Sequence, residues 1–224
     1  MAVRRDNTGV LDHEFSNRVD VKGITDQKSS GRCWLFTGQN VLRPIVMRKY
    51  KLEEFEFSRS YTFFYDQLEK SNLFLEAIIA TSDKPLEDRN VEWLFKNTIG
   101  DGGVWSLFAD VTKKYGIVPL NAMPESYNTE NTAMLNRILN SLLKQYGLEL
   151  RKMSSEKKSI DIIENRKLEM LSDVYRILVI CMGEPPSDFV YKYKDKNGNK
   201  VERKFTPKEF YDKFVGVDLD DYIL

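Results

Sequence analysis

Cys33 has a side chain that can act as a nucleophile, and the stretch around it, DQKSSGRCWLF at residues 26–36, contains groups that can assist it. A thiol attacks an acyl carbon as the thiolate, which a helix N-terminus or a nearby cation stabilises. Cys33 follows a Ser-Gly turn and precedes an apolar run, so we expect it where a helix begins. The amide of Gln27, on the approach loop, can point at the same spot and donate to the oxyanion of a tetrahedral intermediate. The stretch therefore contains two of the groups that a thiol nucleophile needs.

Each of these features also has a plain structural interpretation. A single cysteine before an apolar run is more often a buried structural residue than a nucleophile. Cys181, within an apolar helix face, is interpreted as such a core residue, and two cysteines do not form a disulfide framework. Gly102 and Gly103, in the loop GDGG, permit a close backbone approach but equally fit an ordinary tight turn. No single one of these residues distinguishes a catalytic from a structural role. Only the combination of residues around Cys33 can do so.

The elements that must position Cys33 are mostly helical. Ser58 is a predicted N-cap, Pro44 a predicted kink inside the first helix, and Gly116 a predicted C-cap. Alternation of Phe189, Tyr191 and Tyr193 predicts a strand of a hairpin. Hydrophobic spacing predicts helices at about 33–50, from 59 onward, around 93–95, and at 104–115, 130–146, 160–182 and 207–214, with hairpin strands near 189–193 and 201–205 joined by a two-residue Asn197-Gly198 turn.

Composition excludes several classes of protein. Lys plus Arg and Asp plus Glu both total 34, so the chain has no basic excess of the kind that binds nucleic acid. No signal-like segment opens the chain, and the apolar run at 177–182 is too short to span a bilayer. We expect a cytoplasmic protein without a membrane partner, a metal site or a cofactor.

The stretch QKSSGRCW at residues 27–34 resembles the active-site segment of papain-type cysteine peptidases. The similarity is greatest to the branch that contains bleomycin hydrolase and the bacterial aminopeptidase C enzymes. It extends from residue 13 to about 214, through the stretches EFEFSRSY, DGGVW, KYGIVP, PESYNTE and GEPP. The combination of these motifs is specific for that branch.

The resemblance assigns expected roles to residues near Cys33. It implies that Cys33 is the nucleophile, and that Gln27 and the backbone N–H of Cys33 form the oxyanion hole. Trp34 is expected to pack beside the site, while the backbone of Gly102 and Gly103 pairs with an extended peptide substrate. Ser30 stands where secreted relatives have a disulfide cysteine, which fits a reducing compartment.

The general base of the family is missing from its expected place. In that family a His, oriented by an Asn, comes from the C-terminal half of the fold. This chain has one histidine, His13, in the context LDHEFSN, which does not resemble the base motif. We therefore expect an α+β, papain-like chain made of an N-terminal segment at 1–25, the helical half of the catalytic domain at 26–127, and a helix-and-hairpin insertion at 128–224, with the C-terminal β-barrel half absent.

Three functional hypotheses follow from the resemblance. The first is a bleomycin hydrolase-like cysteine aminopeptidase that cleaves peptides through a Cys33 thioester, and of which this chain alone is catalytically incomplete. The second is a non-catalytic interaction module that forms homo-oligomers through the insertion. The third is the N-terminal part of a split enzyme whose barrel half is a separate polypeptide.

Overall fold

The structure, a computed structural model, describes residues 23–194 and 198–222. His13 and most of the segment 1–25 therefore lie outside the described residues. The described part is α+β and mostly helical, with one two-stranded antiparallel sheet. Its elements are α1 (Cys33–Tyr50), α2 (Arg59–Ala80), α3 (Arg89–Lys96), α4 (Trp105–Tyr115), α5 (Tyr127–Glu130), α6 (Ala133–Ser155), α7 (Ile160–Met182), β1 (Phe189–Lys194), β2 (Lys200–Phe205) and α8 (Pro207–Glu209), with short 3-10 turns η2 (Leu120–Ala122) and η4 (Leu219–Asp221).

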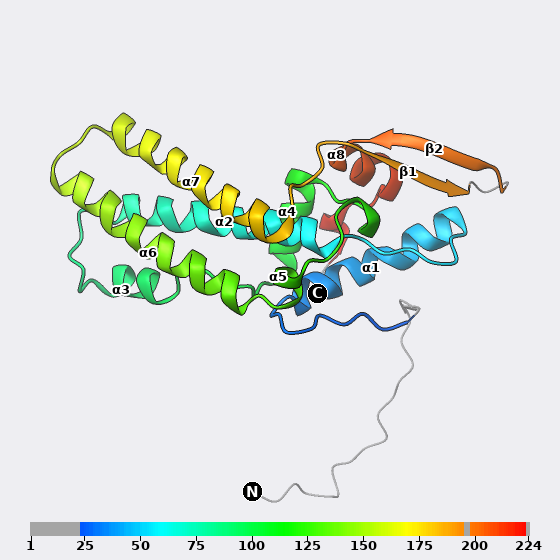
Figure 1. The fold of residues 1–224 in the computed structure, drawn as a ribbon, viewed down its shortest axis with the longest axis horizontal. Coiled ribbons are helices and arrows are strands. Elements are labelled where there is room, and N and C mark those ends of the chain that lie inside the picture. The colour runs from blue at the N-terminus through cyan, green and yellow to red at the C-terminus, as the bar shows by residue number, and fades with distance from the viewer. Residues whose placement is uncertain (1–22, 195–197, 223–224) are drawn as a thin grey trace, which may run out of the picture.

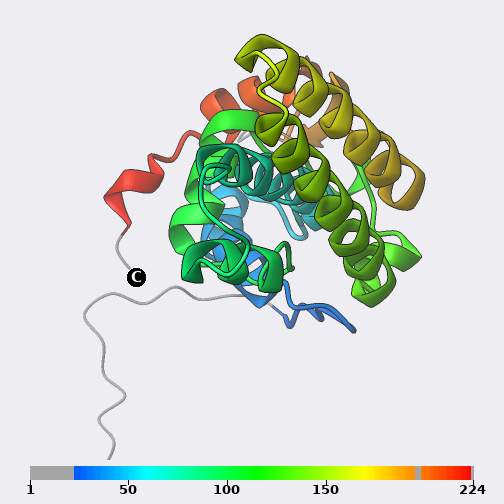
Figure 2. The same cartoon turned by 90° about the vertical axis from the view of Figure 1, so that its left-hand side faces the viewer.

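Helix α2 is the centre of the packing. The long helices α6 and α7 pack against it and against each other, and α1 and α4 contact it from other sides. Figure 1 shows α6 and α7 toward one end of the molecule and the hairpin with α8 toward the other. Figure 2 looks along the same bundle from the α6 and α7 end. One cluster of buried hydrophobic side chains extends through α1, α2, α6, α7 and the hairpin. The hydrophobic core is therefore shared by the two expected parts of the chain, 26–127 and 128–224.

Local sequence chemistry fixes several helix ends as predicted. The hydroxyl of Ser58 accepts a hydrogen bond from the backbone N–H of Tyr61 at 3.0 Å, which caps α2. Pro44 lies inside α1, and Gly116 ends α4 with φ of 80°. Because a side chain is strained at that φ, glycine is the favoured residue there. The predicted caps at Ser58 and Gly116 are confirmed, and so is the place of Pro44 inside the first helix.

Other predictions need correction. Helix α6 begins at Ala133 and continues to Ser155, nine residues beyond the predicted end at 146. Ile138 lies three residues after Leu135, a spacing that predicts a buried position, yet it is 40% exposed. Burial instead follows Leu135, Leu139 and Leu143 toward α2 and α7.

The hairpin forms, but in a different register from the one predicted. Phe189 pairs with Phe205 and Lys194 with Lys200, which leaves the five residues 195–199 between the strands. An odd number does not fit a two-residue turn at 197–198, and Asn197 lies outside the described residues. The predicted helix at 207–214 is α8 continued by a π-helical segment, Phe210–Val215. Of the helices described, none has the length and apolar character needed to cross a membrane.

Candidate active site

Cys33 is the first residue of α1, and its side chain is exposed. The N–H groups of Leu35 and Phe36 both donate to the carbonyl of Arg32, the residue that precedes the helix. The N–H of Cys33, at the first helical position, has no carbonyl of an earlier turn to bind. It is thus placed to donate to an oxyanion that forms on an acyl group attached to the Cys33 sulfur. No acidic residue lies in the first turn to oppose a thiolate.

Gln27 is held in a short loop that leads into α1. Its Nε2 donates to the carbonyl of Ser30 at 2.7 Å, and the hydroxyl of Ser30 donates back to the carbonyl of Gln27 at 2.6 Å. These reciprocal bonds close the loop. A side-chain amide carries two N–H groups, so donation to Ser30 leaves the second for a ligand.

The glycine loop and Trp34 meet beside Cys33. Trp34 is 8% exposed, and its Nε1 donates to the carbonyl of Asp101 at 2.8 Å. A Cβ on Gly103 would lie 2.6 Å from the Trp34 ring, whereas a Cβ on Gly102 would meet nothing within 4 Å. Glycine is required at 103 by the packing of Trp34. At 102, nothing among the described residues requires it.

Asp101 joins these parts, and the sequence analysis missed it. Its Oδ2 accepts from the backbone N–H of Gly31 at 2.7 Å and from the hydroxyl of Thr132 at 2.5 Å. A Cβ on Gly31 would lie 2.6 Å from this carboxylate, so Gly31 is glycine because Asp101 approaches it. Burial raises the pKa of Asp101, but the bonds from Thr132 and Gly31 outweigh it and leave the pKa below its ordinary value.

Lys70 braces the glycine loop from α2 and was also missed. Its ammonium donates to the carbonyls of Gly102 at 2.6 Å and Gly100 at 3.1 Å, and it lies 5.5 Å from the centre of the Trp34 ring. Its counter-ion is Asp66 at 2.8 Å. Burial raises the pKa of Asp66 to about 6, although Lys70 and Gln67 oppose the shift. The only sequence signal was the i, i+4 spacing of Asp66 and Lys70.

Arg32, directly before Cys33, is a buried cation with 1% of its surface exposed. Its Nη1 lies 2.9 Å from the Glu125 carboxylate, and its Nε donates to the Ser30 hydroxyl at 3.0 Å. The guanidinium also lies over the rings of Phe36 and Phe63, at 5.3 and 5.4 Å. Burial lowers the pKa of Arg32, and Glu125 opposes that shift.

The structure thus places Gln27, Cys33 and Trp34 on the loop and first turn of α1, next to the loop of Gly102 and Gly103, and Asp101 joins the two through Gly31 and Trp34. Cys181 is far along the chain, half-buried against the core at the end of α7. Burial raises the pKa of its thiol. It therefore packs much as predicted, although it is not fully buried.

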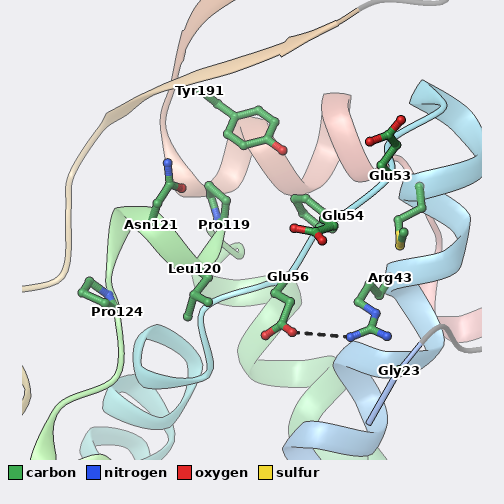
Figure 3. Close-up of a pocket in the computed structure, with 12 residues that line it drawn as sticks. Gly23, Arg43, Glu53, Glu54, Glu56, Pro119, Leu120, Asn121, Pro124 and Tyr191 are labelled. Atoms are coloured by element: carbon green, nitrogen blue, oxygen red, sulfur yellow. Dashed lines mark ion pairs between the residues drawn. The ribbon is translucent and has the colours of Figure 1, made fainter. Parts of the chain in front are cut away.

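A pocket of about 770 Å³ lies elsewhere, between α1, the segment 53–56, the segment 119–124 and the hairpin. Figure 3 shows Glu53, Glu54 and Glu56 along it, with an ion pair between Glu56 and Arg43. The predicted site residues are not among its lining residues. In the described stretches of the chain, no group of three or more His, Cys, Asp or Glu side chains could hold a metal ion.

Comparison with known proteins identifies the family of the chain. The model of the Peptidase C1-like family matches residues 2–224. The chain is 44% identical over 214 residues to aminopeptidase C of Lactobacillus delbrueckii subsp. lactis and 47% identical over 214 residues to aminopeptidase C of Lactobacillus helveticus. Each match covers 95% of this chain and 48% of the relative, so the chain spans about half the length of these relatives.

A solved structure matches as well. The crystal structure of PepW from Lactobacillus rhamnosis HN001 superposes with a TM-score of 0.88 at 40% identity. The match covers 94% of this chain and 48% of that one.

Proposed function

The chain belongs to the Peptidase C1-like family, and from this membership we propose that it carries the nucleophile of a cysteine-type aminopeptidase. The observation that supports the proposal best is the exposed Cys33 at the first turn of α1, directly after the loop that holds Gln27. A structural cysteine gains nothing from exposure at a helix N-terminus, whereas a thiolate is stabilised there.

The proposed chemistry begins with attack of the Cys33 sulfur on the carbonyl carbon of a substrate's N-terminal peptide bond. The oxyanion that forms accepts hydrogen bonds from the Gln27 amide and the Cys33 N–H. Collapse of this intermediate breaks the C–N bond and leaves an acyl thioester, which water then hydrolyses. Gly102, where a side chain would meet open space, offers its backbone to the extended peptide, with Gly103 beside it.

The leaving amine and the attacking water need a general acid and base. The one histidine of this chain is His13, and we propose that the base and its Asn partner come from polypeptide outside these 224 residues. Residues 26–127 then form the helical half of a papain-like domain and 128–224 its insertion. The base belongs either to the same protein or, in a split enzyme, to a separate chain that bears the barrel half.

The alternative is a non-catalytic module that assembles through the insertion. Exposed apolar side chains on α6 and α7 favour assembly under either hypothesis, and they include Met134, Ile138, Leu148, Ile162, Leu168 and Ile180. A cytoplasmic setting is part of the proposal, because Cys33 and Cys181 are both free thiols.

The test is to join this chain to the part of Lactobacillus helveticus aminopeptidase C that it does not match. We expect aminoacyl-4-nitroanilide hydrolysis at background for the chain alone, since acid–base catalysis supplies ~10²–10⁴-fold, and measurable turnover for the fusion. Cys33→Ala should abolish that turnover, and Gln27→Ala should lower kcat by ~10²–10³-fold. Cys181→Ala is the matched control and should retain activity.

Two results would contradict the proposal. Turnover of the fusion that survives Cys33→Ala would show that Cys33 is not the nucleophile. A folded fusion that stays inactive while Cys33 is alkylated normally would favour the interaction module.

A further inference from the structure

The Gln27 loop is connected to a buried ion pair whose presence the proposed chemistry does not by itself explain. Burying a guanidinium is unfavourable unless each polar atom finds a partner. Arg32 is nevertheless almost fully buried immediately before the nucleophile, with its charge matched by Glu125, 93 residues away in the sequence. The hydrogen-bond partners of Arg32 show which part of the site this ion pair holds in place.

The bonds form a directed chain from Arg32 to Gln27. A guanidinium only donates hydrogen bonds, so the Ser30 hydroxyl must accept from Arg32 Nε. A serine hydroxyl has one hydrogen, and with one lone pair of its oxygen engaged by Arg32 that hydrogen is directed at the backbone carbonyl of Gln27. The side-chain amide of Gln27 in turn donates a hydrogen bond to the backbone carbonyl of Ser30. The orientation of the amide is thus set by the position of the guanidinium.

Arg32 itself has little freedom to move. Glu125 holds Nη1, and the rings of Phe36 and Phe63 lie against the guanidinium. Because Nε and Nη1 belong to one rigid plane, fixing one donor fixes the direction of the other. A lysine at this position could reach one partner but has no second donor at the place of Nε.

We propose that Arg32 is a positioning residue that aims the Gln27 amide at the oxyanion, acting through the Ser30 hydroxyl. This inference rests on the proposed function, in which Gln27 stabilises the oxyanion. It adds that the amide depends on a buried ion pair formed with the segment before α5.

The test compares two reactions of Cys33 in the 224-residue chain. With 4-nitrophenyl acetate, the thiolate attacks the acetyl carbon, an oxyanion forms, the C–O bond breaks, and 4-nitrophenolate leaves with its electron pair, giving an acetyl thioester. With iodoacetamide, the thiolate displaces iodide from a methylene carbon, and no oxyanion forms. Both reactions need the thiolate and neither needs a general acid, since both leaving groups are good. The ratio of the two rates at Cys33, read by mass spectrometry of its peptide, therefore reports oxyanion stabilisation.

We expect Gln27→Ala to lower this ratio about tenfold or more, the effect of one hydrogen bond to a charged group. Arg32→Lys should lower it by a similar factor, and the double variant should be no lower than Gln27→Ala alone. Arg59→Lys is the matched control. Arg59 is also buried and lies over Phe36 at 4.7 Å, but its ion pair is with Glu56 rather than with the Gln27 loop. Its ratio should stay at the wild-type value.

Ser30→Ala covers the case in which Arg32→Lys does not fold, because it removes the linking hydroxyl and keeps the pair of Arg32 with Glu125. It should lower the ratio as Arg32→Lys does. The inference is overturned if Arg32→Lys and Ser30→Ala leave the ratio unchanged while Gln27→Ala lowers it, or if the effects of Arg32→Lys and Gln27→Ala multiply in the double variant. If Gln27→Ala has no effect, the oxyanion role in the proposed function fails along with this inference.

Discussion

Gly103→Ala should destabilise the fold by pressing on Trp34. The added Cβ would lie 2.6 Å from Cε2 of the indole, closer than carbon atoms approach without displacement. The ring cannot swing away freely, because it is buried, bonded to the carbonyl of Asp101 and covered by Lys70. Overpacking of this kind costs ~1–3 kcal/mol, and the lower entropy of an unfolded alanine chain returns ~0.4–1 kcal/mol. We expect a net loss of about 1–2 kcal/mol.

Gly102→Ala is the matched control, one residue away in the same loop. Its Cβ would meet nothing within 4 Å, and Gly102 is not among the glycines with positive φ. The folded state should therefore accept the methyl group, with stability unchanged or raised by a few tenths of a kcal/mol. If Gly102 faces the substrate, the same methyl group should raise KM in the active fusion.

The assay is urea unfolding followed by tryptophan fluorescence. With a slope of ~1–3 kcal/mol per molar urea, Gly103→Ala should lower the midpoint by roughly 0.5–1 M, and Gly102→Ala should not lower it. Equal midpoints for the two variants would refute the packing argument. A loss of stability in Gly102→Ala would show that its surroundings are not open.

Three further predictions use other parts of the molecule. Cys33 should be alkylated by iodoacetamide at pH 8 faster than Cys181, because Cys33 is exposed while burial raises the pKa of Cys181; equal rates at the two peptides would contradict this. Burial raises the pKa of Asp66 to about 6, above that of an unfolded carboxyl near 3.9, so its contribution to stability is present below about pH 3.9 and lost as the pH rises through 6. The unfolding free energy of Asp66→Asn should therefore gain on that of the wild type by about 2 kcal/mol between pH 4 and 7, and a constant difference would contradict the shift. Light scattering should show self-association that weakens in Leu168→Glu and Ile180→Glu, whose wild-type side chains are 60% and 77% exposed, and a wild-type monomer at high concentration would oppose it.

The sequence was a good guide to features set by neighbouring residues. Ser58 and Gly116 act on backbone groups within a few positions, so their roles can be recognised without the fold. The end of α6 and the exposure of Ile138 depend instead on how α6 lies between its neighbours, and periodicity alone gave both incorrectly. The hairpin shows the same limit, since its strands were predicted correctly but their register was predicted incorrectly.

In the candidate site, too, some residues could be predicted from the sequence and others could not. Cys33, Gln27 and the glycines were found because their motifs are short and continuous. The residues that hold them act across long separations in the chain, 70 residues from Asp101 to Gly31 and 93 from Arg32 to Glu125. Asp101 was in the GDGG stretch and still passed unnoticed, because its role depends on Gly31 and Thr132, which only the fold brings to it.

The bonds at Asp101 bear on the role of residues 128–224. Thr132 donates to the same carboxylate oxygen as Gly31, and its N–H donates to the carbonyl of Ser29 at 3.3 Å, next to a parallel bridge between Ser29 and Asn131. The start of α6 is thereby attached to both loops that flank Cys33. If residues 128–224 form the proposed insertion, a role in assembly alone would not require these contacts with the loops. Because Asp101 is bonded to Thr132 at 2.5 Å and to Gly31 at 2.7 Å, a displacement of the α6 N-terminus would move the loop before Cys33 with it. Any assembly through α6 would therefore be mechanically connected to the geometry at Cys33.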